Sequence, residues 1–225
     1  MKSFLAILFV LLFGFTANAQ KLSAVNFSNG SKLTFFSFLT DQGAVIRVSE
    51  DGKILEWGTE VLSERGNYYA PKLQPFNIRT EDYDARSDSA YRNKIKSIGA
   101  SYITYYGSTE EEAKRGKIKT LGSLQFDYYS RYDDKSLQGK LKMAGNLLLD
   151  YFRQYENESF RGKLKSVGSV QIAYYSPFDD RYNAGKLKSI GAASYTWYSE
   201  FDRARGALKS NNYRQVISGI SYNLR

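Results

Sequence analysis

The feature that most constrains this chain is a repeat with a period of 23 residues. The phrase Gly-Lys-(Ile/Leu)-Lys-x-x-Gly occurs four times, and an earlier copy lacks only the first glycine; the five copies span 93–99, 116–122, 139–145, 162–168 and 185–191. A weaker sixth copy begins near Gly206. Each full copy leads into a run that ends in an aromatic pair, such as Tyr174-Tyr175. Self-similarity at one fixed period predicts a repeat architecture in which each unit packs on its neighbours.

Apolar and polar residues alternate within each repeat, which indicates β-strands. The central glycine allows two interpretations: one long strand, or a hairpin that turns there. A hairpin at Gly168 would place Lys165 beside Ile172, so the pattern favours one long strand. About 13 strand residues cover roughly 43 Å, and the other 10 residues reach at most about 35 Å, too short for a parallel return. Successive repeats are therefore predicted to run antiparallel, as an up-and-down meander.

The side chains suggest a register for this meander. A loop over residues 133–136 pairs Tyr128 with Leu141 and Tyr132 with Leu137, and places Leu124 against Gly145. The next hairpin, by the same rule, pairs Tyr151 with Leu164, Tyr155 with Phe160 and Leu147 with Gly168. On the opposite face Asp127 is expected between Lys96 and Lys142, and Asp150 between Lys119 and Lys165. Such cross-strand pairs stabilise a register and disfavour a slip by one residue.

The polar face of this meander is the candidate interaction surface. It combines one lysine of each repeat with the second aromatic residue of several pairs: Lys96, Lys119, Lys142, Lys165, Lys188, Tyr106, Tyr129, Tyr175 and Tyr198. Cations bind anionic groups, and aromatic rings offer stacking faces. The partners that fit this pattern are an anionic glycan or another polyanion, or another protein of the cell envelope. The same pattern could bind nucleic acid, although the sequence carries no strong nucleic-acid signal, and a charged outer face is also normal for a solvated sheet.

The N-terminal part of the chain predicts further strands. Residues 32–39 and 44–49 are joined by a short turn, and Asp51-Gly52 is a hairpin signal that pairs Val48 with Leu55 and Ile46 with Trp57. Residues 60–92 are less regular. We therefore expect a β-hairpin region over 20–92 and a repeat region over 93–225, joined in one continuous sheet. That sheet is expected to be closed or strongly coiled, as in a barrel.

Residues 1–19 have the pattern of a secretory signal peptide. Lys2 precedes an apolar run from Phe4 to Phe15, and Ala17-Asn18-Ala19 forms a cleavage motif. The sequence thus predicts an exported protein, located in the periplasm, at the cell surface or outside the cell.

Composition limits the chemistry that the chain can perform. It contains no cysteine and no histidine, so disulfides, thiolate–zinc or imidazole–zinc sites, and Ser-His-Asp or Cys-His catalysis are excluded. The acidic pairs Asp133-Asp134 and Asp179-Asp180 lack the spacing of a calcium loop and are interpreted as turn residues. No nucleophile or paired-acid motif is present. We therefore predict a non-enzymatic protein without a cofactor.

The phrase Gly-Lys-Leu-Lys-Ser-Ile-Gly at 185–191, the paired aromatics and the 23-residue period resemble bacterial MORN-type repeats over about residues 93–210. This resemblance implies an elongated array of β-hairpins that serves as a binding or scaffolding surface. The function expected from the sequence is accordingly binding or scaffolding in the cell envelope. Two alternatives remain open: an outer-membrane β-barrel, and a soluble barrel that binds an apolar ligand.

Overall fold

The computed structural model describes residues 20–60, 72–210 and 212–224. Over these ranges the chain is all-β, as predicted, and its one helical element is the 3₁₀ turn Glu158–Phe160. The strands form two open sheets, of eleven and six strands. The predicted signal peptide lies outside the described ranges, as does 61–71 of the irregular N-terminal region.

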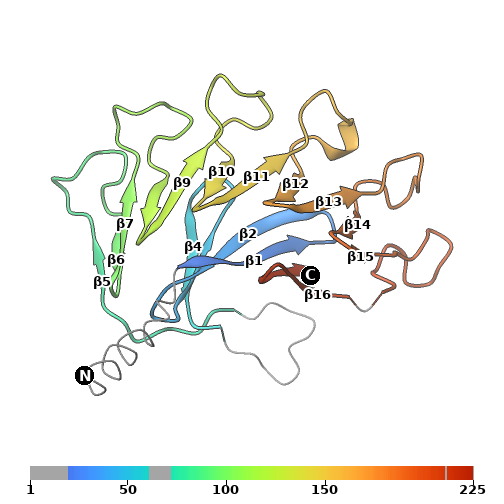
Figure 1. Ribbon diagram of the computed structural model, residues 1–225, viewed down its shortest axis with the longest axis horizontal. Coiled ribbons are helices and arrows are strands. Elements are labelled where there is room, and N and C mark those ends of the chain that lie inside the picture. Colours follow the sequence, from blue (N-terminus) through green and yellow to red (C-terminus); the bar gives the residue numbers. More distant parts are fainter. Residues whose placement is uncertain (1–19, 61–71, 211, 225) are drawn as a thin grey trace, which may run out of the picture.

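The eleven-stranded sheet contains the repeats and is an antiparallel meander, since each strand pairs with its neighbours in sequence. Its strands are β5 (Thr80–Asp82), β6 (Ile95–Ile98), β7 (Ser101–Tyr105), β8 (Ile118–Leu121), β9 (Leu124–Tyr128), β10 (Leu141–Ala144), β11 (Leu147–Tyr151), β12 (Leu164–Val167), β13 (Val170–Tyr174), β14 (Leu187–Ile190) and β15 (Ala193–Ser194). Figure 1 shows them side by side as an open fan, with the loops between repeats projecting outward.

Each repeat is a short hairpin that turns at its central glycine, so the prediction of one long strand was wrong. In the third full repeat, Val167 of β12 pairs with Val170 of β13, and Gly168-Ser169 form the turn. Gly168 has a φ of +55°, in the left-handed region that favours glycine. Glycine with positive φ at the first of two turn residues is the arrangement of a type II′ hairpin, whose twist matches that of its strands.

A β-bulge in every repeat explains the error. Where repeats pair, the register skips one lysine: Leu141 opposes Tyr128 and Met143 opposes Asp127, with Lys142 between them. The skipped residues, hereafter the bulge lysines, are Lys96, Lys119, Lys142, Lys165 and Lys188. Because a bulge inserts one unpaired residue, it breaks the strict alternation of faces. A repeat can therefore fold back on itself without placing these lysines in the core.

The predicted register between repeats is partly confirmed. Tyr128 pairs with Leu141, and Tyr151 pairs with Leu164. Beyond the bulge the pairing shifts, so Phe126 opposes Ala144. The contacts of glycine with leucine are present: a Cβ atom on Gly145 would lie 2.8 Å from Leu124 Cδ2, and one on Gly168 would lie 3.2 Å from Leu147 Cδ2.

The pairs predicted nearer the loops are absent. β9 ends at Tyr128, so Tyr132 lies in the following loop and is exposed, while Leu137 is buried. Tyr155 is likewise an exposed loop residue. The predicted cross-strand ion pairs of Asp127 and Asp150 also differ: Asp127 binds Lys114 at 2.5 Å, and Asp150 accepts a hydrogen bond from Tyr129.

We expected the N-terminal strands to continue the repeat sheet, but this prediction was wrong. They form a separate sheet with the two C-terminal strands. The order of this six-stranded sheet is β16 (Arg214–Ile217), β17 (Ile220–Leu224), β1 (Lys21–Ser28), β2 (Lys32–Leu39), β3 (Val45–Val48) and β4 (Ile54–Gly58). β1 and β17 pair in parallel, so the first and last strands of the described chain lie side by side. Of the predicted pairs, Ile46–Trp57 is confirmed, whereas Val48 opposes Ile54. Within the described ranges neither sheet is closed or strongly coiled, so this part of the prediction was wrong.

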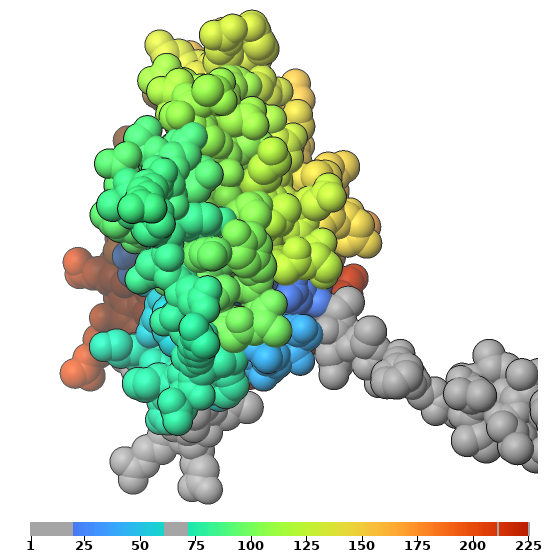
Figure 2. Space-filling model, turned by 90° about the vertical axis from the view of Figure 1, so that its left-hand side faces the viewer, coloured from blue at the N-terminus to red at the C-terminus, as the bar shows by residue number. Residues whose placement is uncertain are grey.

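The core lies between the two sheets. Phe38 of β2 meets Phe126 of β9 edge to face, with ring centroids 5.0 Å apart. Turns of the six-stranded sheet also supply acceptors to residues beside the bulges: Leu141 N–H donates to Glu50 O and Leu187 N–H donates to Gly30 O, both at 2.7 Å. In Figure 2, which looks from the side of the first repeats, the yellow-green loops around residues 130–140 stand at the top of the molecule.

Candidate interaction surface

The structure brings the bulge lysines together with aromatic rings, as the sequence suggested. Lys142 Nζ lies 5.2 Å from the centre of the Tyr129 ring, within the range of a cation–π contact. The equivalent pairs are Lys119–Tyr106, Lys165–Phe152 and Lys188–Tyr175; Lys96 instead contacts Tyr102, and Tyr198 contacts Lys209. The nine predicted residues therefore form a ladder of lysine and aromatic contacts.

The charges in this ladder are largely compensated within the molecule. A carboxylate of the preceding loop, nine residues earlier, lies beside each of four bulge lysines: Glu110 with Lys119, Asp133 with Lys142, Glu156 with Lys165 and Asp179 with Lys188. The hydrogen bond from Lys188, with those from Ser176, holds the pKa of Asp179 far below its usual range. These ion pairs thus hold each loop against its strand, and the four lysines are not free cations.

The second aromatic residue of three pairs is a tyrosine that connects neighbouring repeats. Tyr106 O–H donates to Phe126 O at 2.8 Å, Tyr129 donates to Leu149 O at 3.0 Å, and Tyr175 donates to Tyr195 O at 2.9 Å. Burial, with help from nearby Asp127, raises the pKa of Tyr106 to about 12. These tyrosines therefore have a structural role, which explains why the aromatic residues come in pairs.

A second set of lysines reaches the next repeat from inside the loops. Lys140 Nζ donates to Gly162 O at 2.7 Å and pairs with Glu50 at 3.1 Å. Lys94, Lys117, Lys163 and Lys186 make the same bond to the loop glycine of the next repeat. Desolvation lowers the pKa of Lys117 and of Lys163. Both lysines of the repeated phrase are therefore used in folding.

The loop carboxylates fold the loops themselves. Asp133 accepts a hydrogen bond from Ser130 N–H at 2.6 Å, and Asp179 accepts from Ser176 N–H at 3.0 Å. Such bonds are the turn chemistry that the sequence predicted for these acidic pairs. Among the described residues, no group of three or more acidic side chains is arranged to hold a metal ion.

Hydrogen bonds also join adjacent loops. A carboxylate accepts from a backbone N–H of the next loop at three successive places: Asp88 from Ser108, Glu111 from Arg131 and Asp134 from Gln154. At the next equivalent place the residues are Asn157 and Pro177, and proline has no N–H to donate. The first four loops are thus joined into a continuous rim by these bonds.

Four loops expose a large aromatic side chain at one equivalent position, which the sequence analysis missed. This tip position is the third residue after the aromatic pair, and the exposed fractions are 81% for Tyr132, 88% for Tyr155, 98% for Phe178 and 89% for Phe201. These four residues, hereafter the aromatic tips, are 23 residues apart. They are the most exposed of the large hydrophobic side chains in the described part of the chain.

Folding does not require an aromatic residue at the tip position. The first two loops have the same base but carry Arg86 and Thr109 there. Exposed aromatic clusters commonly mark interaction sites, since water solvates such rings poorly. The 23-residue spacing of Tyr132 and Tyr155 is the sequence signal that could have revealed the tips, but the predicted register placed both residues in strands.

Exposed basic side chains accompany the tips. They include Arg131, Lys135, Arg153, Arg161, Arg181, Arg203 and Arg205. The Arg131 guanidinium lies 4.8 Å from the centre of the Tyr132 ring and donates to its hydroxyl at 2.5 Å. Residues 129–209 carry fourteen basic and nine acidic side chains, so this part of the array has a net positive charge.

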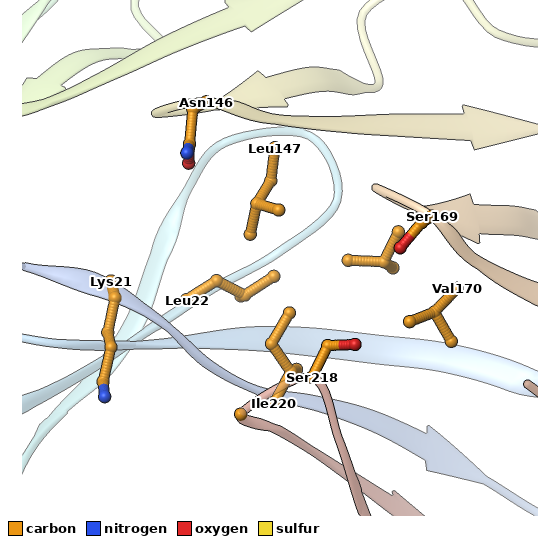
Figure 3. Close-up of a pocket in the computed structure, with 10 residues that line it drawn as sticks. Lys21, Leu22, Asn146, Leu147, Ser169, Val170, Ser218 and Ile220 are labelled. Carbon is orange, nitrogen blue, oxygen red and sulfur yellow. The ribbon is translucent and has the colours of Figure 1, made fainter.

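A separate pocket of about 230 Å³ lies at the opposite ends of the hairpins. Figure 3 shows it between the glycine turns of the repeats and strand β1, with Leu22, Leu147 and Ile220 pointing into it. The polar side chains of Lys21 and Asn146 lie at its edge. The pocket is smaller than most ligand sites, and its hydrogen-bonding groups do not converge on one point.

Within the described ranges, no helix has the length and apolar character needed to cross a membrane. Comparisons of the chain with models of protein families, with curated proteins and with solved structures find no match.

Proposed function

We propose that this protein is an exported, non-enzymatic binding protein that holds a partner in the cell envelope against the outer rim of its repeat array. The observation that carries this proposal is the set of aromatic tips: four large rings at one loop position, each at least 81% exposed. Burial of such rings on a partner supplies much of the binding energy at many interfaces.

The geometry favours the rim over the lysine ladder as the contact surface. A bulge lysine such as Lys188 already has a carboxylate at 2.8 Å and an aromatic ring at 5.7 Å. A polyanion would have to displace these contacts before it could bind the lysine. The aromatic tips, by contrast, lose few protein contacts when a partner covers them. Their loops are held by backbone hydrogen bonds, so little conformational entropy is lost on binding.

Co-sedimentation of the mature protein with a cell-envelope fraction tests the proposal. We expect the variant Tyr132→Ser/Tyr155→Ser/Phe178→Ser/Phe201→Ser to bind at least about tenfold more weakly than the wild type. The matched control, Leu55→Ser/Leu148→Ser/Val216→Ser, removes exposed apolar side chains from strands and should bind normally. Equal binding by wild type and tip variant, with thermal unfolding unchanged, would refute the proposed surface.

Export is tested separately, through the predicted signal peptide. N-terminal mass analysis of the secreted protein should give Gln20 as the first residue.

A further inference from the structure

We infer that the partner of the rim is a linear acidic polysaccharide, which crosses successive loops and stacks its sugar rings on the aromatic tips. This inference rests on the proposed function and assigns the chemical class of the partner. It combines three observations: the spacing of the tips, the shape of the rim, and the charges between the tips.

The tips are spaced for an elongated partner. Neighbouring tips are separated by one hairpin of two strands. Two strand spacings amount to about 10 Å at the level of the sheet. The four tips therefore span at least roughly 30 Å. The loops project outward in different directions in Figure 1, so the tips follow a convex rim. A flat bilayer cannot meet all parts of a convex rim at once, whereas a flexible chain can follow it.

The tips have the chemistry of a stacking platform. Phe178 and Phe201 have no hydrogen-bonding group, so they recognise a partner through ring contacts alone. The face of an aromatic ring is electron-rich and attracts weakly positive C–H groups. One face of a sugar ring presents such C–H groups, and a polysaccharide repeats that face at regular intervals. A series of separate rings on one rim fits such a periodic ligand.

The charges favour a sparsely anionic chain. The exposed guanidinium groups of Arg153, Arg181 and Arg203 make no ion pair within the described residues, and guanidinium binds carboxylate in a bidentate manner. The same loops carry exposed carboxylates, including Glu158 and Glu200. A nucleic acid has a charge at every nucleotide and would meet these carboxylates, which repel it. A polysaccharide with one carboxylate in every second sugar can avoid them.

Binding of purified polymers tests the inference directly. The probes are hyaluronan and unsulfated chondroitin of several chain lengths, each with one carboxylate in every second sugar, with neutral dextran, oligo(dT) and phosphatidylglycerol vesicles for comparison. We expect the acidic polysaccharides to bind, with an affinity that rises with chain length until the chain spans the rim. The four-tip serine variant should lose at least about tenfold in affinity. The variant Arg153→Gln/Arg181→Gln/Arg203→Gln should bind several times more weakly, with a shallower dependence on salt.

The outcomes separate this inference from the proposed function. Failure of both acidic polysaccharides to bind would overturn the inference, as would binding that the four-tip substitutions leave unchanged. Preferential binding to oligo(dT) or to vesicles would also overturn it. If the envelope fraction still retains the wild type and not the tip variant, the proposed function stands although the polysaccharide is wrong. Thermal unfolding of each variant checks that the fold is preserved.

Discussion

The first two loops of the repeat array and the four that follow share a base and differ at the tip. In both groups a lysine donates to a glycine carbonyl of the next repeat, as Lys94 and Lys163 do. The tip position holds Arg86 and Thr109 in the first group and exposed aromatics in the second. A loop of this kind therefore folds with a polar tip. The aromatic tips are a feature that folding does not require.

The same contrast exists between neighbouring aromatic residues of one repeat. Tyr128 is 1% exposed and donates its hydroxyl hydrogen to Ile118 O, whereas Tyr132, four residues later, is 81% exposed. The inner aromatics hold the sheet together, and the tips contribute little to stability. Experiments that treat these two groups separately can therefore distinguish folding from binding.

The largest effect should come from alkaline pH, which acts on the inner tyrosines. Burial raises the pKa of Tyr128, Tyr151 and Tyr174 well above 10.0, the ordinary value for tyrosine. The folded state then keeps protons that the unfolded state loses, so stability is fully present below about pH 10 and falls as pH rises. Each such tyrosine costs about 1.4 kcal/mol per pH unit in this range.

The buried lysines act in the opposite direction. Desolvation lowers the pKa of Lys117 and Lys163, so their buried charges destabilise the folded state. This destabilisation disappears as pH rises toward 10.5, because the lysines lose their protons. The tyrosines dominate because more of them are affected and they are more deeply buried. We expect cooperative unfolding above pH 10, detected by circular dichroism together with tyrosinate absorbance. An alkaline midpoint that moves when Tyr132 and Tyr155 are replaced by serine would contradict the division between inner and tip aromatics.

The second prediction compares two substitutions within one repeat. Tyr128→Ala should destabilise the protein by about 3–5 kcal/mol, because it leaves a cavity between the sheets and removes a hydrogen bond. Tyr132→Ala should change the free energy of unfolding by less than about 0.5 kcal/mol. Urea denaturation measures both values. Similar losses for the two variants would show that the tip also supports the fold.

A smaller effect is expected from completing the series of inter-repeat hydrogen bonds. Phe152 occupies the position at which Tyr106, Tyr129 and Tyr175 donate to a carbonyl of the next repeat. Phe152→Tyr should supply the missing donor and stabilise the protein by about 0.5–1.5 kcal/mol. Chemical denaturation gives the difference, and Phe178→Tyr serves as a control at an exposed site. No gain from Phe152→Tyr would mean that the hydroxyl does not reach its acceptor.

The smallest change in stability should come from extending the aromatic tips to the second loop. Thr109→Tyr should alter the free energy of unfolding by less than about 0.5 kcal/mol, since the side chain is exposed. It should increase binding to the envelope fraction severalfold, because it adds a fifth ring to the row. Thr196→Tyr places a ring at an exposed site outside the loops and should leave binding unchanged. Unchanged binding with Thr109→Tyr would limit the contact surface to the last four loops.

Much of the fold could be predicted from periodicity, and the error made within each repeat has one physical cause. The all-β class, the antiparallel meander and the pairing of Tyr128 with Leu141 follow from the 23-residue period and the alternation of residues. The hairpin at Gly168 was missed because a strict period of two has no place for the bulge at Lys165. A bulge depends on pairing with another strand, which a local pattern does not contain.

The candidate site, like the fold, could be predicted only in part from the sequence. The sequence predicted that the bulge lysines and the second aromatic residues share the outer face, but the carboxylates that pair with these lysines come from loops whose path the sequence did not define. Lys142 could be placed on the outer face from its position alone. Its proximity to Asp133 required the loop to turn back over the strand.

The sequence by itself determined the repeat, the all-β class and the antiparallel order of the repeats, because these follow from the 23-residue period and from the short-range preferences of β-branched and aromatic residues. Tertiary structure decided how two sheets share the core and which aromatic rings remain in water. Tyr128 and Tyr132 have the same side chain, yet one lies against the six-stranded sheet and the other lies past the end of its strand. Burial depends on what packs against a residue, and for Tyr128 that partner, Gly52, lies far away in the chain.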